Sequence, residues 1–247
     1  SFHYGLLQHP SILPLFPSAD RLPMKEHRKW VRSLGDGGCS EAWYRSHFVT
    51  AAGRRHAGSR HHPAVTGETT PWYLFADGAA AVASHHAPDA RILVVLRDPV
   101  ERAWSHFNEQ RRRGHEPLED FAAALDAESS RSQHGLSGTY PMSPTEAHEH
   151  LTYRLQGEYV NGLRPWIERF ERVMVIRSED FYADAPRWLG QAAEFLGVGS
   201  HTFSSERRNA TAPSPRPPAE VTNELRRHYA PLNEELADLL SRDMSWE

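Results

Sequence analysis

The sequence has 247 residues, which is enough for one sizeable α/β domain and too few for a second domain of that size. Its hydrophobic content of 39%, charged content of 24% and net charge of −4 exclude a general polyanion-binding surface, so we expect no nucleic-acid partner. The single cysteine, Cys39, excludes an intramolecular disulfide and a cysteine-based zinc site. No apolar run approaches the roughly 20 residues of a membrane-spanning helix and no signal peptide is visible, so we expect a cytoplasmic protein without a membrane span.

The chain begins with a predicted helix that runs into a loop over residues 1–15, since Phe2, Leu6 and Leu7 share one helical face. A charged stretch follows at residues 25–32 and contains the only two lysines of the chain. On composition alone this stretch is as readily a solvent-exposed face as a functional site.

The remaining elements are predicted from apolar periodicity and from turn residues. In chain order we expect a helix at 41–48, a short strand and a turn from 65 to 72, a helix from 73 to 86, a strand at 92–96, helices at 99–113 and 118–127, a loop at 128–143, a helix at 147–170, a strand at 173–178, a helix at 186–196, an irregular stretch at 200–218 and a helix at 221–240. The loop at 128–143 is long and aperiodic, and loops of this kind often act as lids or binding loops, so we expect it to line or cover a substrate cleft.

The most informative stretch is the junction after the strand at residues 92–96. This strand is wholly apolar and largely branched, as a buried parallel strand requires. Asp98 is a good N-cap and Pro99 suits the first helical position, so a helix begins at once. Ligands of open α/β sheets bind at such strand ends, where Arg97 offers a permanent charge and Ser105 a hydroxyl. The alternative is that Arg97 merely pairs with a nearby carboxylate.

The string from Arg97 to Phe107, Arg-Asp-Pro-Val-Glu-Arg-Ala-Trp-Ser-His-Phe, resembles the 3′-phosphate-binding signature of the sulfotransferases that use 3′-phosphoadenosine 5′-phosphosulfate (PAPS). The resemblance extends over nearly the whole chain and is to the heparan-sulfate-type and related bacterial enzymes. It implies that Arg97 and Ser105 hold the 3′-phosphate of PAPS. It also implies a three-layer α/β fold, in which a central parallel sheet is flanked by helices on both faces, as in the P-loop NTPase-like sulfotransferase fold.

The same resemblance assigns roles to residues nearer the ends of the chain. Lys25-Glu26 is similar to a family segment whose glutamate is the usual catalytic base, so Glu26 takes that role and Lys25 faces the leaving group. The family's 5′-phosphosulfate loop is absent, and we expect it and its strand to precede residue 1, with Ser1 at or just beyond the last position of the loop. Arg207 or Arg208 is expected to cover the 3′-phosphate. On this interpretation residues 1–247 form a single sulfotransferase domain.

The predicted reaction is in-line transfer of a sulfuryl group from PAPS to a hydroxyl or amine of a small-molecule, carbohydrate or lipid acceptor, leaving 3′,5′-diphosphoadenosine. The donor carries its own leaving group, so no metal is required. Two alternatives stay open: a nucleotide-dependent kinase of related topology, although no Walker lysine is present, and a degenerate domain that binds the nucleotide without catalysis. The sequence leaves the acceptor and the oligomeric state open.

Sixteen histidines raise the question of a metal site. They cluster at His61-His62, at His85-His86, and at His148 and His150. None of these clusters has a carboxylate or a cysteine at the spacing of structural zinc sites, so we expect no metal.

Overall fold

The computed structural model describes residues 12–13, 64–135, 142, 144–199, 201–203 and 216–246. The chain divides into two compact units. One unit comprises Ser1–Thr70 and Phe181–Asn209, and the other comprises Pro71–Asp180 and Ala210–Glu247. The predicted helix at 41–48 and nearly all of the predicted helix and loop at 1–15 lie outside the described residues.

The first unit contains a parallel strand pair and a helix. Strand β1 (Ile12–Leu13) pairs with β2 (Val65–Thr66), so the segment at 12–13, which the sequence predicts as loop, is a strand. Its partner lies far along the chain, and apolar periodicity within residues 1–15 carries no signal of such a pairing. Helix α12 (Ala185–Leu196) begins after Asp184, whose carboxylate caps it, and ends at Gly197 in the left-handed conformation. The strand at β2 and the helix at 186–196 are therefore confirmed, the latter within one residue.

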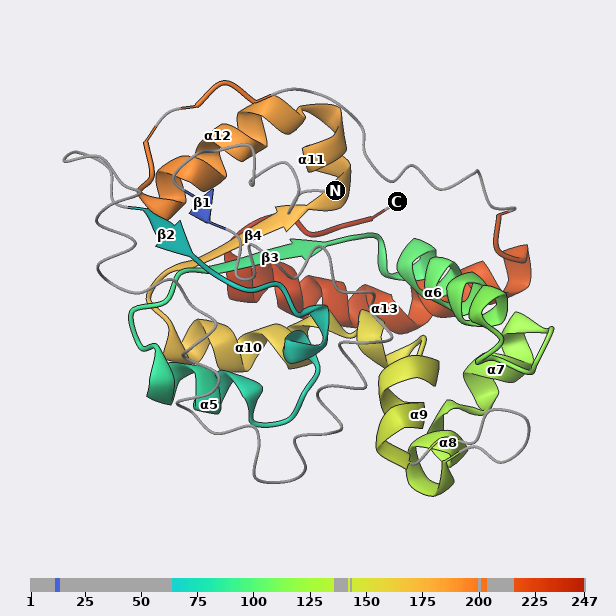
Figure 1. Cartoon of the computed structure of the whole chain (residues 1–247). Helices are drawn as coiled ribbons and strands as arrows, with labels where there is room; N and C mark the ends of the chain where they lie inside the picture. Colours follow the sequence, from blue (N-terminus) through green and yellow to red (C-terminus); the bar gives the residue numbers. More distant parts are fainter. Residues whose placement is uncertain are drawn as a thin grey trace. The chain divides into compact units, whose positions relative to one another are not determined.

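The second unit is built on strands β3 (Ile92–Leu96) and β4 (Val173–Arg177), which run parallel and in register (Figure 1). Both strands were predicted from their apolar runs. Helices α10 (Tyr159–Arg169) and α13 (Ala219–Leu240) pack against one face of this pair. Alternate strand residues supply that face: Ile92, Val94, Leu96, Val173 and Val175. This alternation is what a period of two requires of a strand with a buried face.

The predicted helix at 73–86 is split. A 3-10 turn, η2 (Pro71–Leu74), is followed by α5 (Ala79–His86), and Gly78 between them has a positive φ of 77°. A left-handed residue cannot continue a right-handed helix, so the chain turns at Gly78 before α5 begins. Helix α10 packs on α5, and Gly162 of α10 lies so close to the carbonyl of Leu74 that a Cβ there would come within 2.3 Å of its oxygen.

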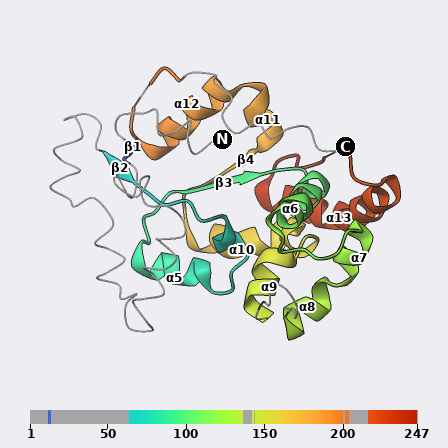
Figure 2. The same cartoon turned by 45° about the vertical axis from the view of Figure 1, so that its right-hand side comes forward.

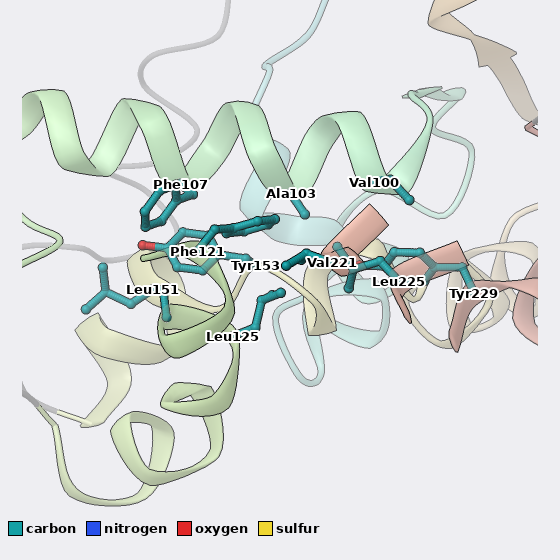
Figure 3. Packing of buried hydrophobic residues seen from close by; sticks show 11 residues of the cluster. Val100, Ala103, Phe107, Phe121, Leu125, Leu151, Tyr153, Val221, Leu225 and Tyr229 are labelled. Atoms are coloured by element: carbon teal, nitrogen blue, oxygen red, sulfur yellow. The ribbon is translucent and has the colours of Figure 1, made fainter. Parts of the chain in front are cut away.

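Helix α6 (Pro99–Arg113) follows β3 as predicted. The Asp98 carboxylate accepts hydrogen bonds from the amides of Val100 and Glu101, and Gly114 ends the helix in the left-handed conformation. The buried face of α6 packs into an apolar cluster (Figure 3). That cluster comprises Val100, Ala103, Phe107, Phe121, Ala124, Leu125, Leu151, Tyr153, Val221, Leu225 and Tyr229. The site-bearing helix is thus fixed along its length by side chains from α13 and from the segment after α6.

The segment predicted as a loop at 128–143 begins with a helix, so this expectation was wrong over residues 128–134. Helices α7 (Phe121–Asp126), α8 (Glu128–His134) and α9 (Pro144–Leu151) are grouped beside α6 (Figures 1 and 2). The inward side chains of α8 are charged. Arg131 forms a buried bidentate pair with Glu116, with N–O distances of 2.6 and 2.9 Å. A helix that buries charged rather than apolar side chains shows no apolar period, which is why the sequence pattern missed it.

The predicted helix at 147–170 is interrupted between α9 and α10 by a short 3-10 turn, η3 (Leu155–Gly157). Glu128 causes the break, because its buried carboxylate accepts the amides of Tyr153 and Arg154 at 2.5 and 2.6 Å. Those amides are then unavailable to the carbonyls of the preceding turn. No helix in the described part of the chain is long and apolar enough to cross a membrane.

Candidate functional site

Arg97 lies at the end of strand β3 and Ser105 on helix α6, the elements on which the sequence predicts them, and both belong to the second unit. Arg97 follows the last residue of β3, and its side chain is 44% exposed. The guanidinium lies 3.6 Å from the carboxylate of Glu101. Ser105 is exposed one helical turn beyond Glu101, so the three side chains are spaced four residues apart. The junction therefore presents a cation and a hydroxyl to solvent, with a carboxylate between them.

The peptide unit between Arg97 and Asp98 is held on both sides. The amide of Asp98 donates to Glu179 Oε1 at 2.9 Å, and the hydroxyl of Tyr159 donates to the carbonyl of Arg97 at 2.8 Å. Glu179 lies just beyond the end of β4, and Tyr159 begins α10. Side chains from two other elements thus fix the backbone from which Arg97 projects.

The amide and the side chain of Asp98 belong to a closed ring of hydrogen bonds. The carboxylate of Asp98 accepts from Arg226 Nη2 at 3.2 Å, and Arg226 Nη1 donates to the carbonyl of Trp246 at 2.7 Å. The indole of Trp246 donates to Glu179 Oε2 at 3.1 Å, which returns to the amide of Asp98. A pocket of about 340 Å³ adjoins the ring and is lined in part by Asp98, Arg226 and Trp246.

The pKa values of the two groups that bind the Arg97–Asp98 peptide, Glu179 and Tyr159, are shifted by their surroundings. Burial acts to raise the pKa of Glu179, but hydrogen bonds from the Asp98 amide, its own amide, Trp246 and Ser178 outweigh it and lower the pKa. Burial raises the pKa of Tyr159 to about 12, so this phenol remains a proton donor. An ionised Glu179 and a protonated Tyr159 are the forms that the two bonds to the Arg97–Asp98 peptide require.

Three residues around this peptide, Tyr159, Glu179 and Trp246, lie in segments that the sequence marks only by resemblance to the family. Gly157-Glu158-Tyr159, Ser178-Glu179-Asp180-Phe181 and the C-terminal Met-Ser-Trp-Glu are each similar to family segments, yet no role follows from their patterns. Nothing in the sequence singled out Arg226, because it is one of two adjacent arginines on an amphipathic helix.

The other predicted site residues are not placed. Ser1, Lys25, Glu26, Arg207 and Arg208 lie outside the described residues, as does the pair His61-His62. Among the residues that the structure does describe, no group of three or more His, Cys, Asp or Glu side chains could hold a metal ion. His85 and His86 contact each other, and the ring of His148 contacts Trp72 and hydrogen bonds to Ser132.

Comparisons with known proteins point to one kind of enzyme. No family model matches the chain. It is 23% identical over 217 residues to mouse heparan sulfate glucosamine 3-O-sulfotransferase 3B1, a match that covers 74% of the chain and 50% of the relative. It is 28% identical over 180 residues to human carbohydrate sulfotransferase 15, covering 65% of the chain and 32% of the relative. The chain therefore spans at most about half the length of these two relatives.

The comparison with solved structures also finds a sulfotransferase, and this match covers a larger share of the chain. The crystal structure of a sulfotransferase from Alicyclobacillus acidocaldarius superposes with a TM-score of 0.70 at 25% identity. The match covers 98% of this chain and 90% of that one. These findings confirm both the resemblance on which the site was assigned and the predicted α/β fold class.

Proposed function

We propose that this chain, which is related to sulfotransferases by sequence and by fold, transfers a sulfuryl group from PAPS to a carbohydrate hydroxyl. The observation that carries the proposal is the β3–α6 junction. Arg97 stands there at the carboxyl end of a parallel strand, on a backbone held by Glu179 and Tyr159, and Ser105 is exposed on the helix that follows. Ligands of open α/β sheets bind at this edge. A guanidinium and a hydroxyl there suit a phosphate group.

The donor site uses Arg97 and Ser105 for the 3′-phosphate. The pair between Arg97 and Glu101 is an exposed contact at 3.6 Å, and exposed pairs contribute little, so a phosphate dianion can replace it. In this proposal Arg207 or Arg208 covers the same phosphate, and Ser1 lies at the edge of the 5′-phosphosulfate site.

The chemical step is an in-line displacement at sulfur. The acceptor oxygen forms a bond to sulfur while the bond from sulfur to the 5′-phosphate oxygen breaks, and 3′,5′-diphosphoadenosine leaves. Glu26 takes the acceptor proton, and Lys25 stabilises the charge that develops on the leaving oxygen. As in phosphoryl transfer, positioning and charge stabilisation supply most of the catalysis. In the proposed step Lys25 supplies the stabilising charge and the donor carries its own leaving group, so no metal is required.

The acceptor class is proposed from the relatives. Their names specify heparan sulfate glucosamine and carbohydrate, so a sugar hydroxyl is the first acceptor to test. An amine, a small-molecule hydroxyl and a lipid hydroxyl are the other arms of the same assay.

Two measurements test the proposal. Calorimetric titration should show binding of 3′,5′-diphosphoadenosine and much weaker binding of ATP with magnesium, whereas a kinase would reverse that order. Incubation with PAPS and pooled carbohydrate, lipid and small-molecule acceptors should then release diphosphoadenosine and yield a sulfated product. Binding without any transfer would favour the non-catalytic alternative, and a preference for ATP would overturn the proposal.

A further inference from the structure

The Arg97–Asp98 peptide lies just beyond the paired part of the sheet. The register between β3 and β4 ends with Leu96 opposite Arg177, so the next peptide has left the ladder. Its amide and carbonyl are instead bonded to Glu179 and Tyr159. The direction in which the Arg97 side chain departs is therefore set by two side chains rather than by strand pairing.

Trp246 contacts both of these clamping side chains. Its indole donates to Glu179 at 3.1 Å, and its ring centroid lies 6.0 Å from that of Tyr159. Trp246 is only 8% exposed, and the guanidinium of Arg177 lies over its ring, 5.4 Å from the centroid. The C-terminal segment is thus packed into the base of the candidate donor site.

Arg226 connects that segment to the junction. Its two terminal nitrogens bind the carbonyl of Trp246 and the carboxylate of Asp98, so one guanidinium bridges the C-terminal segment and the cap of α6. Asp98 is 7% exposed, and its other oxygen already accepts the first free amides of α6. Movement of Arg226 would leave a buried carboxylate half-satisfied, which is costly.

We propose that Arg226 and Trp246 are positioning residues for the donor site. They hold the peptide from which Arg97 projects and so fix where its guanidinium meets the 3′-phosphate. This inference rests on the proposed function, because it assigns a role relative to the phosphate that Arg97 binds. It places part of the specificity for a 3′-phosphorylated nucleotide in the C-terminal helix and the segment after it.

A purely structural role makes a different prediction. Loss of Arg226 would then lower the melting temperature and leave nucleotide selectivity in the folded protein unchanged. The discriminating quantity is the dissociation constant of adenosine 5′-monophosphate divided by that of 3′,5′-diphosphoadenosine. The two ligands differ only in the 3′-phosphate, so this ratio measures how much the 3′-phosphate contributes to binding. Global destabilisation affects both ligands alike, whereas misplacement of Arg97 weakens only the second.

The experiment is a double-mutant cycle on that ratio, with Arg226→Met and Arg97→Ala alone and together. We expect Arg226→Met to lower the ratio by about tenfold and to have almost no further effect once Arg97 is alanine, as coupled positions behave. The matched control is Arg242→Met. Arg242 is as exposed as Arg226 and also binds one carboxylate, on Asp180, and one carbonyl, on Val175, and neither of these two partners belongs to the Arg97–Asp98 peptide. The control should leave the ratio unchanged.

Two further variants keep the test decisive if Arg226→Met folds poorly. Trp246→Phe keeps a ring and removes the donor to Glu179, and it should lower the ratio by about threefold, as expected for one lost hydrogen bond. Arg226→Lys keeps the charge and bridges less well, so it should restore part of the selectivity. The positioning role alone would be overturned if the effects of Arg226→Met and Arg97→Ala simply add. It would also be overturned if Arg97→Ala changes the ratio while no variant of Arg226 or Trp246 does. A wild-type protein with no preference for diphosphoadenosine would overturn the proposed function as well.

Discussion

The guanidinium of Arg97 lies 3.6 Å from the carboxylate of Glu101, on the side of α6 that also carries Ser105. A phosphate that binds both Arg97 and Ser105 must displace this carboxylate or lie beside it. Glu101 therefore competes for the cation that the proposed donor site depends on.

We expect Glu101→Gln to bind 3′,5′-diphosphoadenosine about two- to fivefold more tightly than the wild type, because removing an exposed competing charge is worth up to about 1 kcal/mol. Calorimetry at low salt measures this, and the gain should shrink at high salt as the charges are screened. Glu109→Gln, which removes the partner of Arg112 and Arg113 further along α6, serves as the control. Weaker binding by Glu101→Gln would instead make Glu101 a residue that orients Arg97.

Removal of the cation itself should have a larger effect. Arg97→Ala is expected to weaken binding of diphosphoadenosine by about 2–4 kcal/mol, since it removes charge-assisted hydrogen bonds to a desolvated anion. Ser105→Ala should cost about 1 kcal/mol, as for one neutral donor. Equal affinities of the wild type and Arg97→Ala in calorimetric titrations would show that the 3′-phosphate is bound elsewhere.

The proposed base is tested by Glu26→Gln, which keeps the shape of the side chain and removes its basicity. A hydroxyl acceptor has a pKa far above 7, so its proton must leave as the new bond forms. We expect turnover to fall roughly 10²–10⁴-fold with little change in donor affinity. If Glu26 is only a structural partner of neighbouring basic residues, the variant will melt at a lower temperature and keep nearly normal turnover in its folded fraction.

The sequence was most informative where local chemistry determines local structure. The apolar run at 92–96, the cap at Asp98 and the glycine at 114 together predicted β3, α6 and the place of Arg97 correctly. Each of these signals is read within a few residues. The same is true of β4, which is an apolar run, and of the C-terminal helix, whose apolar residues recur at helical spacing.

The sequence was least informative where contacts between residues far apart in the chain determine the local structure. Helix α8 depends on Arg131 meeting Glu116, and the break before α10 depends on Glu128 binding the amide of Tyr153. The bond between Arg226 and Asp98 joins positions 128 residues apart. Buried polar pairs of this kind leave no periodic trace, because either partner alone has the pattern of a surface residue.

Gly157 is required by a close approach that only the structure reveals. A Cβ at this position would lie 2.4 Å from the hydroxyl oxygen of Tyr229, and that hydroxyl donates to the carbonyl of Arg154. Tyr229 is 1% exposed, so it cannot move aside freely. We expect Gly157→Ala to lower the free energy of unfolding by about 1–3 kcal/mol, measured by chemical denaturation.

Gly190, inside α12, provides the matched comparison. Among the described residues, no atom beyond the chain neighbours and the backbone of its own helix lies within 4 Å of a Cβ built there, and its backbone is helical. Gly190→Ala should therefore raise the free energy of unfolding by about 0.4–1 kcal/mol. An equal effect of the two substitutions would mean that the contact with Tyr229 does not limit the size of residue 157.

The last prediction concerns His106, which lies on α6 with its ring centroid 5.0 Å from that of Tyr153. Burial, followed by the charges of Arg102, His150 and Arg113, lowers its pKa from 6.5 to about 3. Nδ1 of His106 is buried without a hydrogen-bond partner among the described residues. The folded protein therefore holds this imidazole neutral, while the unfolded chain binds a proton below pH 6.5. Because the unfolded state then carries more protons, the free energy of unfolding rises with pH between about 3 and 6.5, and the contribution of His106 is fully present above 6.5.

We expect His106 to account for a loss of about 1.4 kcal/mol in the free energy of unfolding between pH 7.5 and pH 5.5. Urea denaturation of the wild type and of His106→Leu at the two pH values isolates this contribution, since every other titrating group is common to both proteins. The variant should lose less stability than the wild type by that amount. An equal loss in both proteins would show that the imidazole is protonated in the folded state as readily as in the unfolded chain.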